Sequence, residues 1–172
     1  MPSYDASCAE CLVFTFKEGL LSSVAHDLRL RITRFSVELD VDRGSVVASF
    51  DTNSLLVDCP MKDGVENPAA LSASDKHKIA AQIRDDVLHS AKYPSATFRA
   101  DSVAAQADGG YELQGELTLH GVKKPLTLRS QLVAGRQRLE LKLHQPDFGI
   151  APYRAMLGTL KIQADVTIRV TV

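Results

Sequence analysis

Alternating apolar and polar residues between positions 111 and 133 constrain the fold of this chain more than any other stretch. The segment YELQGELTLHGVKKPLTLRSQLV alternates in two runs, 111–119 and 126–133, which the break HGVKKP separates. Side chains that alternate with a period of two point to opposite faces of a β-strand. The segment therefore predicts a hairpin with one apolar and one solvated face, in which Gly121 relaxes the turn and Pro125 begins the return strand.

Similar alternation continues along most of the chain. It recurs in further runs, at 12–16, 28–41, 46–57, 96–100, 139–143 and 160–172. The run 28–41 changes parity near Thr33 and Arg34, which favours a bulge in one bent strand, although a short turn between two strands fits almost as well. With the hairpin, these runs predict an all-β fold of about eight antiparallel strands, closed into a barrel because closure removes exposed edges.

One helix interrupts the strands. Residues 58–72 contain Pro and Gly without any periodicity, so we expect a long connection there. After it, Ser72 with Asp75 resembles a capping box, and apolar residues then recur at helical spacing. The pattern predicts an amphipathic helix over 74–89, inserted between strands of the barrel.

Composition limits the organisation and the class of function. The chain has 172 residues, 45% of them hydrophobic, and a formal net charge of -1, which predicts a single domain over 1–172. Without a basic run there is no electrostatic signature of nucleic-acid binding, and no apolar run is long enough for an integral membrane segment. The N-terminal residues lack the features of a secretory signal, so we expect a cytoplasmic protein; a processed chain given a new Met would instead point to the periplasm.

The candidate chemical groups do not assemble into a reactive centre. Cys8 and Cys11 have CxxC spacing, but in a strand that begins at Cys8 they point to opposite faces, and no second CxxC follows. We therefore expect no metal and no cofactor. His26 and Asp27 lie close to serines at 22 and 23, but on opposite faces of a strand they cannot form a catalytic relay, so the sequence predicts a protein that is not an enzyme.

Several strings in order now carry a resemblance. They are FTFKEGLLSSVAHDLRL at 14–30, KYPSATFRAD at 92–101, GELTLHGVKKPLTL at 115–128 and DFGI at 147–150. Together they resemble the YceI-like family of lipocalin-like, polyisoprenoid-binding proteins. The resemblance implies a lipocalin-like barrel whose lumen accepts a long apolar chain, isoprenoid or fatty-acid-like, in proteins most often exported to the periplasm.

A carrier of this kind needs a lining, and the inward parity of the strands supplies candidates. The predicted apolar lining is Phe14, Phe16, Leu28, Leu30, Phe98, Leu117, Leu128, Leu141, Ile162 and Val166. Gly115 leaves room for a guest, and Phe148 flanks an irregular segment near the lumen. His26 would donate a hydrogen bond to a polar head group, or else be a core histidine bonded within the protein. Arg154 would meet an anionic head group at the barrel mouth, or else be a solvated surface arginine.

A second function remains open at the level of sequence. Small residues on the inward face also suit a barrel that is filled by its own side chains. Such a protein would act through its surface as a stress-related interaction scaffold, with 58–72 and the helix 74–89 as contact surface. A homodimer is compatible with either hypothesis.

Overall fold

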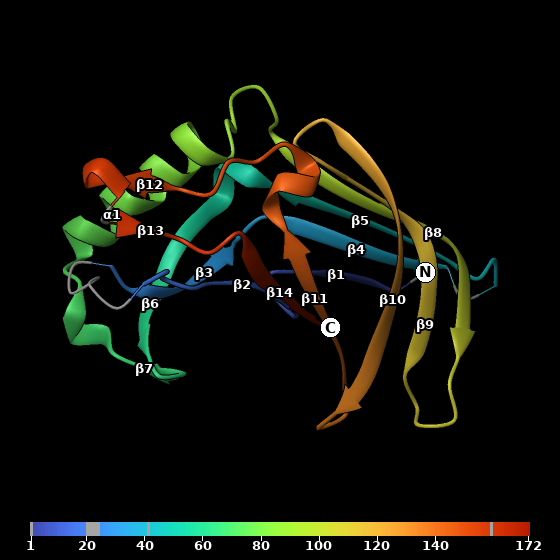
Figure 1. Ribbon diagram of the computed structural model, residues 1–172. Coiled ribbons are helices and arrows are strands. Elements are labelled where there is room, and N and C mark those ends of the chain that lie inside the picture. The colour runs from blue at the N-terminus through green and yellow to red at the C-terminus, as the bar shows by residue number, and fades with distance from the viewer. Residues whose placement is uncertain (1, 20–24, 41, 159) are drawn as a thin grey trace.

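The computed structural model describes residues 2–19, 25–40, 42–158 and 160–172 (Figure 1). Within these ranges the chain forms a twelve-stranded antiparallel sheet, a separate two-stranded ribbon and one α-helix. The elements are β1 (Ser3–Asp5), β2 (Glu10–Thr15), β3 (Asp27–Ile32), β4 (Phe35–Asp40), β5 (Ser45–Asp51), β6 (Leu55–Lys62), β7 (Val65–Glu66), α1 (Ala73–Gln82), β8 (Ser95–Ala105), β9 (Tyr111–Leu119), β10 (Val122–Val133), β11 (Arg136–His144), β12 (Arg154–Ala155), β13 (Leu160–Lys161) and β14 (Asp165–Thr171).

The sheet curls strongly into a half-barrel. Its strand order is β1-β4-β5-β8-β9-β10-β11-β14-β2-β3-β6-β7, and β12 pairs with β13 in the separate ribbon. The prediction of a mostly β fold with one inserted helix is confirmed. The prediction of an eight-stranded closed barrel is wrong, because the sheet is a half-barrel of twelve strands.

The difference in strand number has a simple physical origin at a corner of the sheet. The run 28–41 is interrupted at Thr33 and Arg34, and its partner run 46–57 is interrupted by the short helix η1 (Thr52–Ser54). The Ser54 hydroxyl accepts hydrogen bonds from both backbone N–H groups of the first interruption, at 3.2 and 3.0 Å. Each run is therefore two strands. For the run 28–41, the short turn between two strands is confirmed, and the single bent strand with a bulge is wrong. The short edge strands β1 and β7 have no alternation that would reveal them.

The hairpin that opened the sequence argument forms, with a tighter turn than predicted. β9 and β10 are joined by His120 and Gly121 alone, both in the left-handed region with φ of 52° and 77°. β10 therefore begins at Val122, and Pro125 lies inside it, opposite Glu116. In contrast, the last run 160–172 is not continuous, because β13 pairs with β12 before β14 begins.

The inserted helix begins where the sequence predicts. Ser72 caps α1 through a capping box with Asp75, and after Gln82 the helix continues as a π-helical turn, η3 (Ile83–Val87). The preceding segment 58–72 is not the unstructured connection that its sequence suggests, because it contains the end of β6, β7 and the short helix η2 (Pro68–Ala70). Apolar residues of the helix pack against the concave face of the sheet, together with Leu28, Leu30 and Leu55.

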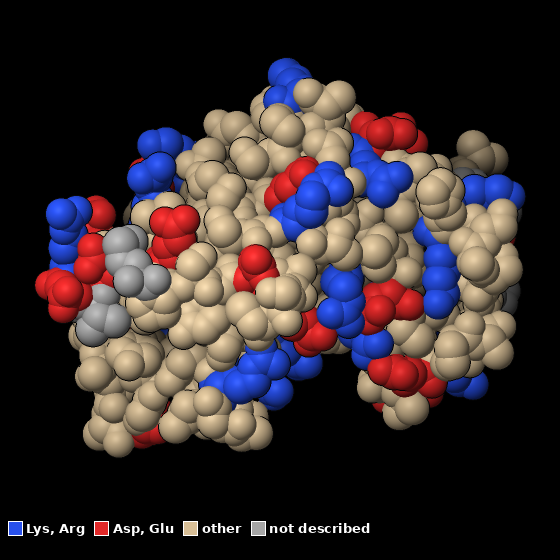
Figure 2. Space-filling view, turned by 180° about the vertical axis from the view of Figure 1, so that it is seen from behind, with Lys and Arg blue, Asp and Glu red and all other residues tan. Residues whose placement is uncertain are grey.

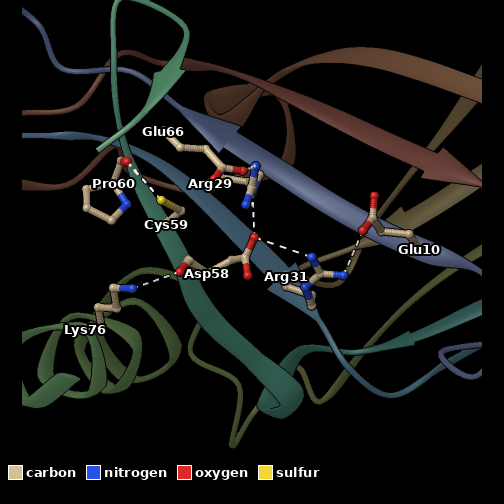
Figure 3. Close-up of polar contacts among 8 residues, drawn as sticks. All are labelled: Glu10, Arg29, Arg31, Asp58, Cys59, Pro60, Glu66 and Lys76. Carbon is tan, nitrogen blue, oxygen red and sulfur yellow. Dashed lines mark hydrogen bonds and ion pairs between the residues drawn. The ribbon is translucent and has the colours of Figure 1, made fainter. Parts of the chain in front are cut away.

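Ion pairs cross the outer face of β2, β3 and β6 (Figure 3). Arg29 binds Asp58 and Glu66, while Arg31 binds Glu10 and Asp58, so Asp58 is shared between two guanidinium groups. Partial burial raises the pKa of Asp58, but the hydrogen bond from Arg29 and the charges of both arginines outweigh it and hold this pKa below its ordinary value. These ion pairs connect four neighbouring strands, β2, β3, β6 and β7, at one end of the sheet order.

Asp58→Asn is expected to lower the free energy of unfolding by about 1 kcal/mol at neutral pH, because each arginine keeps a second carboxylate and access to water. Since the pKa of Asp58 is lowered by folding, its contribution is present above the ordinary value near 3.9 and is lost as the pH falls through the folded pKa. Urea unfolding measures both effects. Glu38→Gln, at an exposed carboxylate on β4, is the control, and an equal loss for both variants would contradict the prediction.

Candidate functional site

The curled sheet and the helix enclose a cavity of about 560 Å³. Its wall comes from the concave face of the long strands, from α1 and η3, and from the ribbon β12–β13, and it is almost entirely apolar. A volume in the range of about 300–1,000 Å³ with few polar groups is typical of sites for small apolar ligands.

Most of the residues predicted to line a lumen lie on the wall of this cavity. The structure places there His26, Leu28, Leu30, Phe98, Leu117, Leu128, Leu141, Ile162 and Val166. They come from β3, β8, β9, β10, β11 and β14 and from the segments beside β3 and β13, so elements far apart in the sequence meet around one space.

The predicted orientation of β2 is wrong. Cys11, Val13 and Thr15 face the cavity, whereas Phe14 and Phe16 do not line it. The guanidinium of Arg169 lies over the ring of Phe14, 4.8 Å from the ring centre, on the outer side of the sheet. Both faces of this strand carry apolar residues, so alternation alone did not decide which face is buried.

Gly115 does not leave room for a guest. It lies beside the β-bulge of β8, where the register shifts between Ala100 and Ser102. A Cβ atom at this position would lie 2.1 Å from the carbonyl oxygen of Arg99 and 2.7 Å from the Cα of Ala100. The glycine is therefore required for close contact between two strands, which corrects its predicted role.

Phe148 and Arg154 also lie off the cavity wall. Phe148 is buried in the core cluster beside the cavity, at the end of the short helix η4 (Gln145–Phe148). Arg154 is exposed on β12 and lines a second, shallower hollow instead. The serines at 22 and 23 fall outside the described residues.

The helix supplies lining residues that the sequence argument assigned elsewhere. From this element and its C-cap the cavity wall includes Ile79, Gln82, Ile83, Val87 and Leu88, and Leu71 precedes the helix on the same wall. Their helical spacing was visible in the sequence, but spacing does not show what a helical face covers. In the structure that face closes one side of the cavity, so the helix is part of the candidate site.

Several polar side chains on the wall form hydrogen bonds within the protein. Ser130 donates a hydrogen bond to Gln137 at 2.8 Å, and Gln137 donates to the carbonyl of Gly109 at 2.9 Å. Thr52 likewise donates to the carbonyl of Tyr93 at 2.8 Å. These groups are satisfied within the protein. His26 also lies on the wall, and no hydrogen bond joins its imidazole to another described residue.

His120 joins three segments near the helix end of the molecule. Its Nδ1 lies 3.2 Å from the carbonyl oxygen of Phe148, and because a carbonyl only accepts, Nδ1 carries the proton. Its ring lies 4.2 Å from that of Tyr93 and 5.6 Å from that of His89, centre to centre. Nε2 is buried and has no hydrogen-bond partner among the described residues. Burial lowers the pKa of His120, and the charges of His89 and Lys92 lower it further, against the opposing effect of the bond to Phe148.

The protein is expected to lose stability as the pH falls below about 6.5, the ordinary value for histidine. Folding lowers the pKa of His120, so in this range the unfolded chain takes up a proton that the folded protein excludes. The loss grows until the pH reaches the folded pKa. Urea unfolding between neutral and mildly acidic pH should show a shallower pH dependence for His120→Gln than for the wild type, with His77→Gln as control. Parallel curves for His120→Gln and wild type would refute the assignment.

The remaining surface has no single dominant charge on the face seen in Figure 2, where lysine and arginine are interspersed with aspartate and glutamate. Among the described residues, no helix is long and apolar enough to cross a membrane, and no three His, Cys, Asp or Glu side chains are placed to hold a metal ion. Cys8 is exposed, whereas burial, assisted by the charge of Glu10, raises the pKa of the Cys11 thiol to about 12. The thiol of Cys11 is therefore unreactive at neutral pH.

Comparison with known proteins gives this architecture a family. The profile described as the YceI-like domain matches residues 10–172. The chain belongs to the YceI-like family. A UPF0312 protein of Vibrio cholerae is 31% identical over 134 residues, which are 70% of this chain and 63% of the relative. Protein YceI of Escherichia coli is 37% identical over 106 residues, 56% of this chain and 51% of the relative. The chain thus spans less than two thirds of the length of these relatives.

Two solved structures share the fold. BcnA of Burkholderia cenocepacia aligns with a TM-score of 0.67 at 17% identity, over 97% of this chain and 96% of BcnA. A polyisoprenoid-binding domain from Saccharophagus degradans, implicated in plant cell wall breakdown, aligns with a TM-score of 0.64 at 17% identity, over 98% of this chain and 94% of that domain. At this identity the likeness concerns the fold.

Proposed function

We propose that this protein binds a long apolar chain, isoprenoid or fatty-acid-like, inside the cavity and carries it without chemical change. The observation that supports the proposal is the apolar cavity of about 560 Å³ between the sheet and the helix. Each methylene group transferred from water into such a space contributes about 0.8 kcal/mol, so a chain of ten or so offsets the cost of association. A structural relative described as a polyisoprenoid-binding domain adds support.

The residues that would hold the chain are the apolar wall residues that the sequence predicted and the structure brings together. Leu28, Leu30, Phe98 and Leu117 are also well buried, so their positions are fixed by the core as well as by a ligand. His26, half-buried on the wall, would bind the polar end of a guest. The hollow centre disfavours the filled-barrel scaffold, and the apolar face of the helix covers the cavity.

Native mass spectrometry of the gently purified protein tests the proposal. We expect a fraction of the protein to retain a noncovalent amphiphile that solvent extraction releases unchanged. After extraction, a fluorescent prenyl or acyl probe should bind with a stoichiometry of about one, as expected for a single cavity of this size. The absence of both a retained lipid and saturable probe binding would overturn the proposed function.

A further inference from the structure

A second hollow lies beside the cavity, between the end of the helix and residues 151–154. Gln82, Val87 and Tyr153 form part of the wall of both spaces. In Figure 1 the ribbon β12–β13 lies beside α1, in agreement with this shared wall. The hollow and the cavity are therefore adjacent and share part of one wall.

The ribbon β12–β13 presents different chemistry on its two faces. Tyr153 accepts a backbone hydrogen bond from Ile162 at 3.1 Å, and both residues line the cavity, as does Leu160. Arg154 and Lys161 are direct partners between these positions, so their side chains share the opposite face. The ribbon is thus apolar toward the cavity and cationic on its other side.

The two cations on the ribbon lack partners within the described part of the chain. Like charges directly opposite each other on paired strands repel. Neither Arg154 nor Lys161 forms an ion pair with a described residue, although most other arginines on the sheet do. Asp86 lines the same hollow as Arg154, and the two form no ion pair. An anion held by this face would relieve the repulsion, and the planar guanidinium fits a carboxylate or phosphate.

We propose that this hollow is the mouth of the cavity and that Arg154, with Lys161 beside it, selects an amphiphile with an anionic head group, a carboxylate or a phosphate monoester. The inference rests on the proposed function, because the tail of the same molecule would occupy the cavity. Gln82, exposed at the rim and shared by both spaces, would donate a hydrogen bond to the head group. Asp86 opposes the anion and limits the selectivity.

Three ligands with one tail and different head groups test the selectivity. Hexadecanol, hexadecanoate and hexadecyl phosphate compete with a fluorescent neutral probe for the delipidated protein. The wild type should bind both anions about tenfold more tightly than the alcohol, the effect of one charge-assisted hydrogen bond. Arg154→Gln should abolish this preference without weakening the alcohol, and Asp86→Asn should increase it. Arg43→Gln, at a highly exposed arginine in the β4–β5 turn, is the matched control and should leave it unchanged.

The outcomes separate the two proposals. Equal binding of all three ligands by the wild type, or an unchanged preference in Arg154→Gln, overturns the head-group inference and leaves the carrier function standing. If none of the three ligands competes with the probe, the carrier function is overturned, and the head-group inference with it.

The position of the mouth is tested by kinetics. Asp86→Cys with Arg154→Cys, in a Cys8→Ser background, places two reactive thiols on the walls of the hollow, while Cys11 and Cys59 stay buried. The neutral probe is loaded first, and a short bismaleimide then joins the two thiols. This should slow release of the probe about tenfold or more, because the cross-link closes the mouth. The double variant without cross-linker is the control. An unchanged release rate after verified cross-linking would overturn the assignment of the mouth.

Discussion

Gly115→Ala is expected to lower the free energy of unfolding by about 3 kcal/mol, a large part of the roughly 5–15 kcal/mol that stabilises an ordinary protein. The added methyl group would lie 2.1 Å from the carbonyl oxygen of Arg99, a backbone atom that no side-chain rotation can move. Relief requires β8 and β9 to separate at the bulge, and the backbone hydrogen bonds there would be lost with the packing.

Urea unfolding of Gly115→Ala and Gly135→Ala distinguishes this contact from the general effect of replacing a glycine. Gly135 has a positive φ of 77° in the β10–β11 turn, but nothing lies within 4 Å of a Cβ atom there. Its replacement should cost only the backbone strain of about 1–2 kcal/mol. Similar losses for the two variants would show that the close approach of β8 and β9 is not what requires Gly115.

Gly115 also illustrates what the sequence could and could not predict. Alternation with Leu113 and Leu117 placed it on the inward face of a hairpin, and the hairpin is present. Alternation reports which face a residue shares, but not how closely the neighbouring strand approaches. A bulge in β8 (Ser95–Ala105) decides the environment of a residue in β9. The local sequence around position 115 does not indicate this bulge.

Other predictions succeeded or failed for similarly local reasons. β3 was oriented correctly because its outer positions are Arg29 and Arg31, which cannot be buried without partners. The orientation of β2 failed because Leu12, Val13 and Phe14 give it apolar residues on both faces. The outer aromatic ring of Phe14 is covered by the guanidinium of Arg169, a contact from the far end of the chain.

The site was predictable in its chemistry but less in its boundary. Most of the residues that strand parity predicted lie on the cavity wall, because the wall is the concave face of the sheet. The helical side of the wall was missed. An amphipathic pattern shows which face of α1 is buried, but not what that face packs against. The separate ribbon was missed for another reason: β12 and β13 are two residues long each, too short to show a periodicity of their own.

Ala48→Phe is expected to weaken binding of a saturated or prenyl chain about a hundredfold. Ala48 is 4% exposed, lies on the cavity wall, and pairs with Phe98 across β5 and β8. A phenyl ring there would exclude about four methylene groups of the guest, a loss of about 3 kcal/mol, which corresponds to about two orders of magnitude in affinity. Stability of the empty protein should hold or rise, because the ring fills unoccupied apolar space. Probe titration and thermal unfolding measure the two effects.

Val47→Phe provides the matched control for this experiment. Val47 is the preceding residue of the same strand, points to the outer face and is 36% exposed, so the same aromatic ring is added outside the cavity. Its affinity for the probe should equal that of the wild type. Because successive residues of a strand differ only in the face they occupy, a difference between these variants would locate the ligand on the concave side of the sheet. If Ala48→Phe folded and bound the probe as tightly as Val47→Phe, the guest could not occupy the space between β5 and the helix, and the cavity would not be the carrier site.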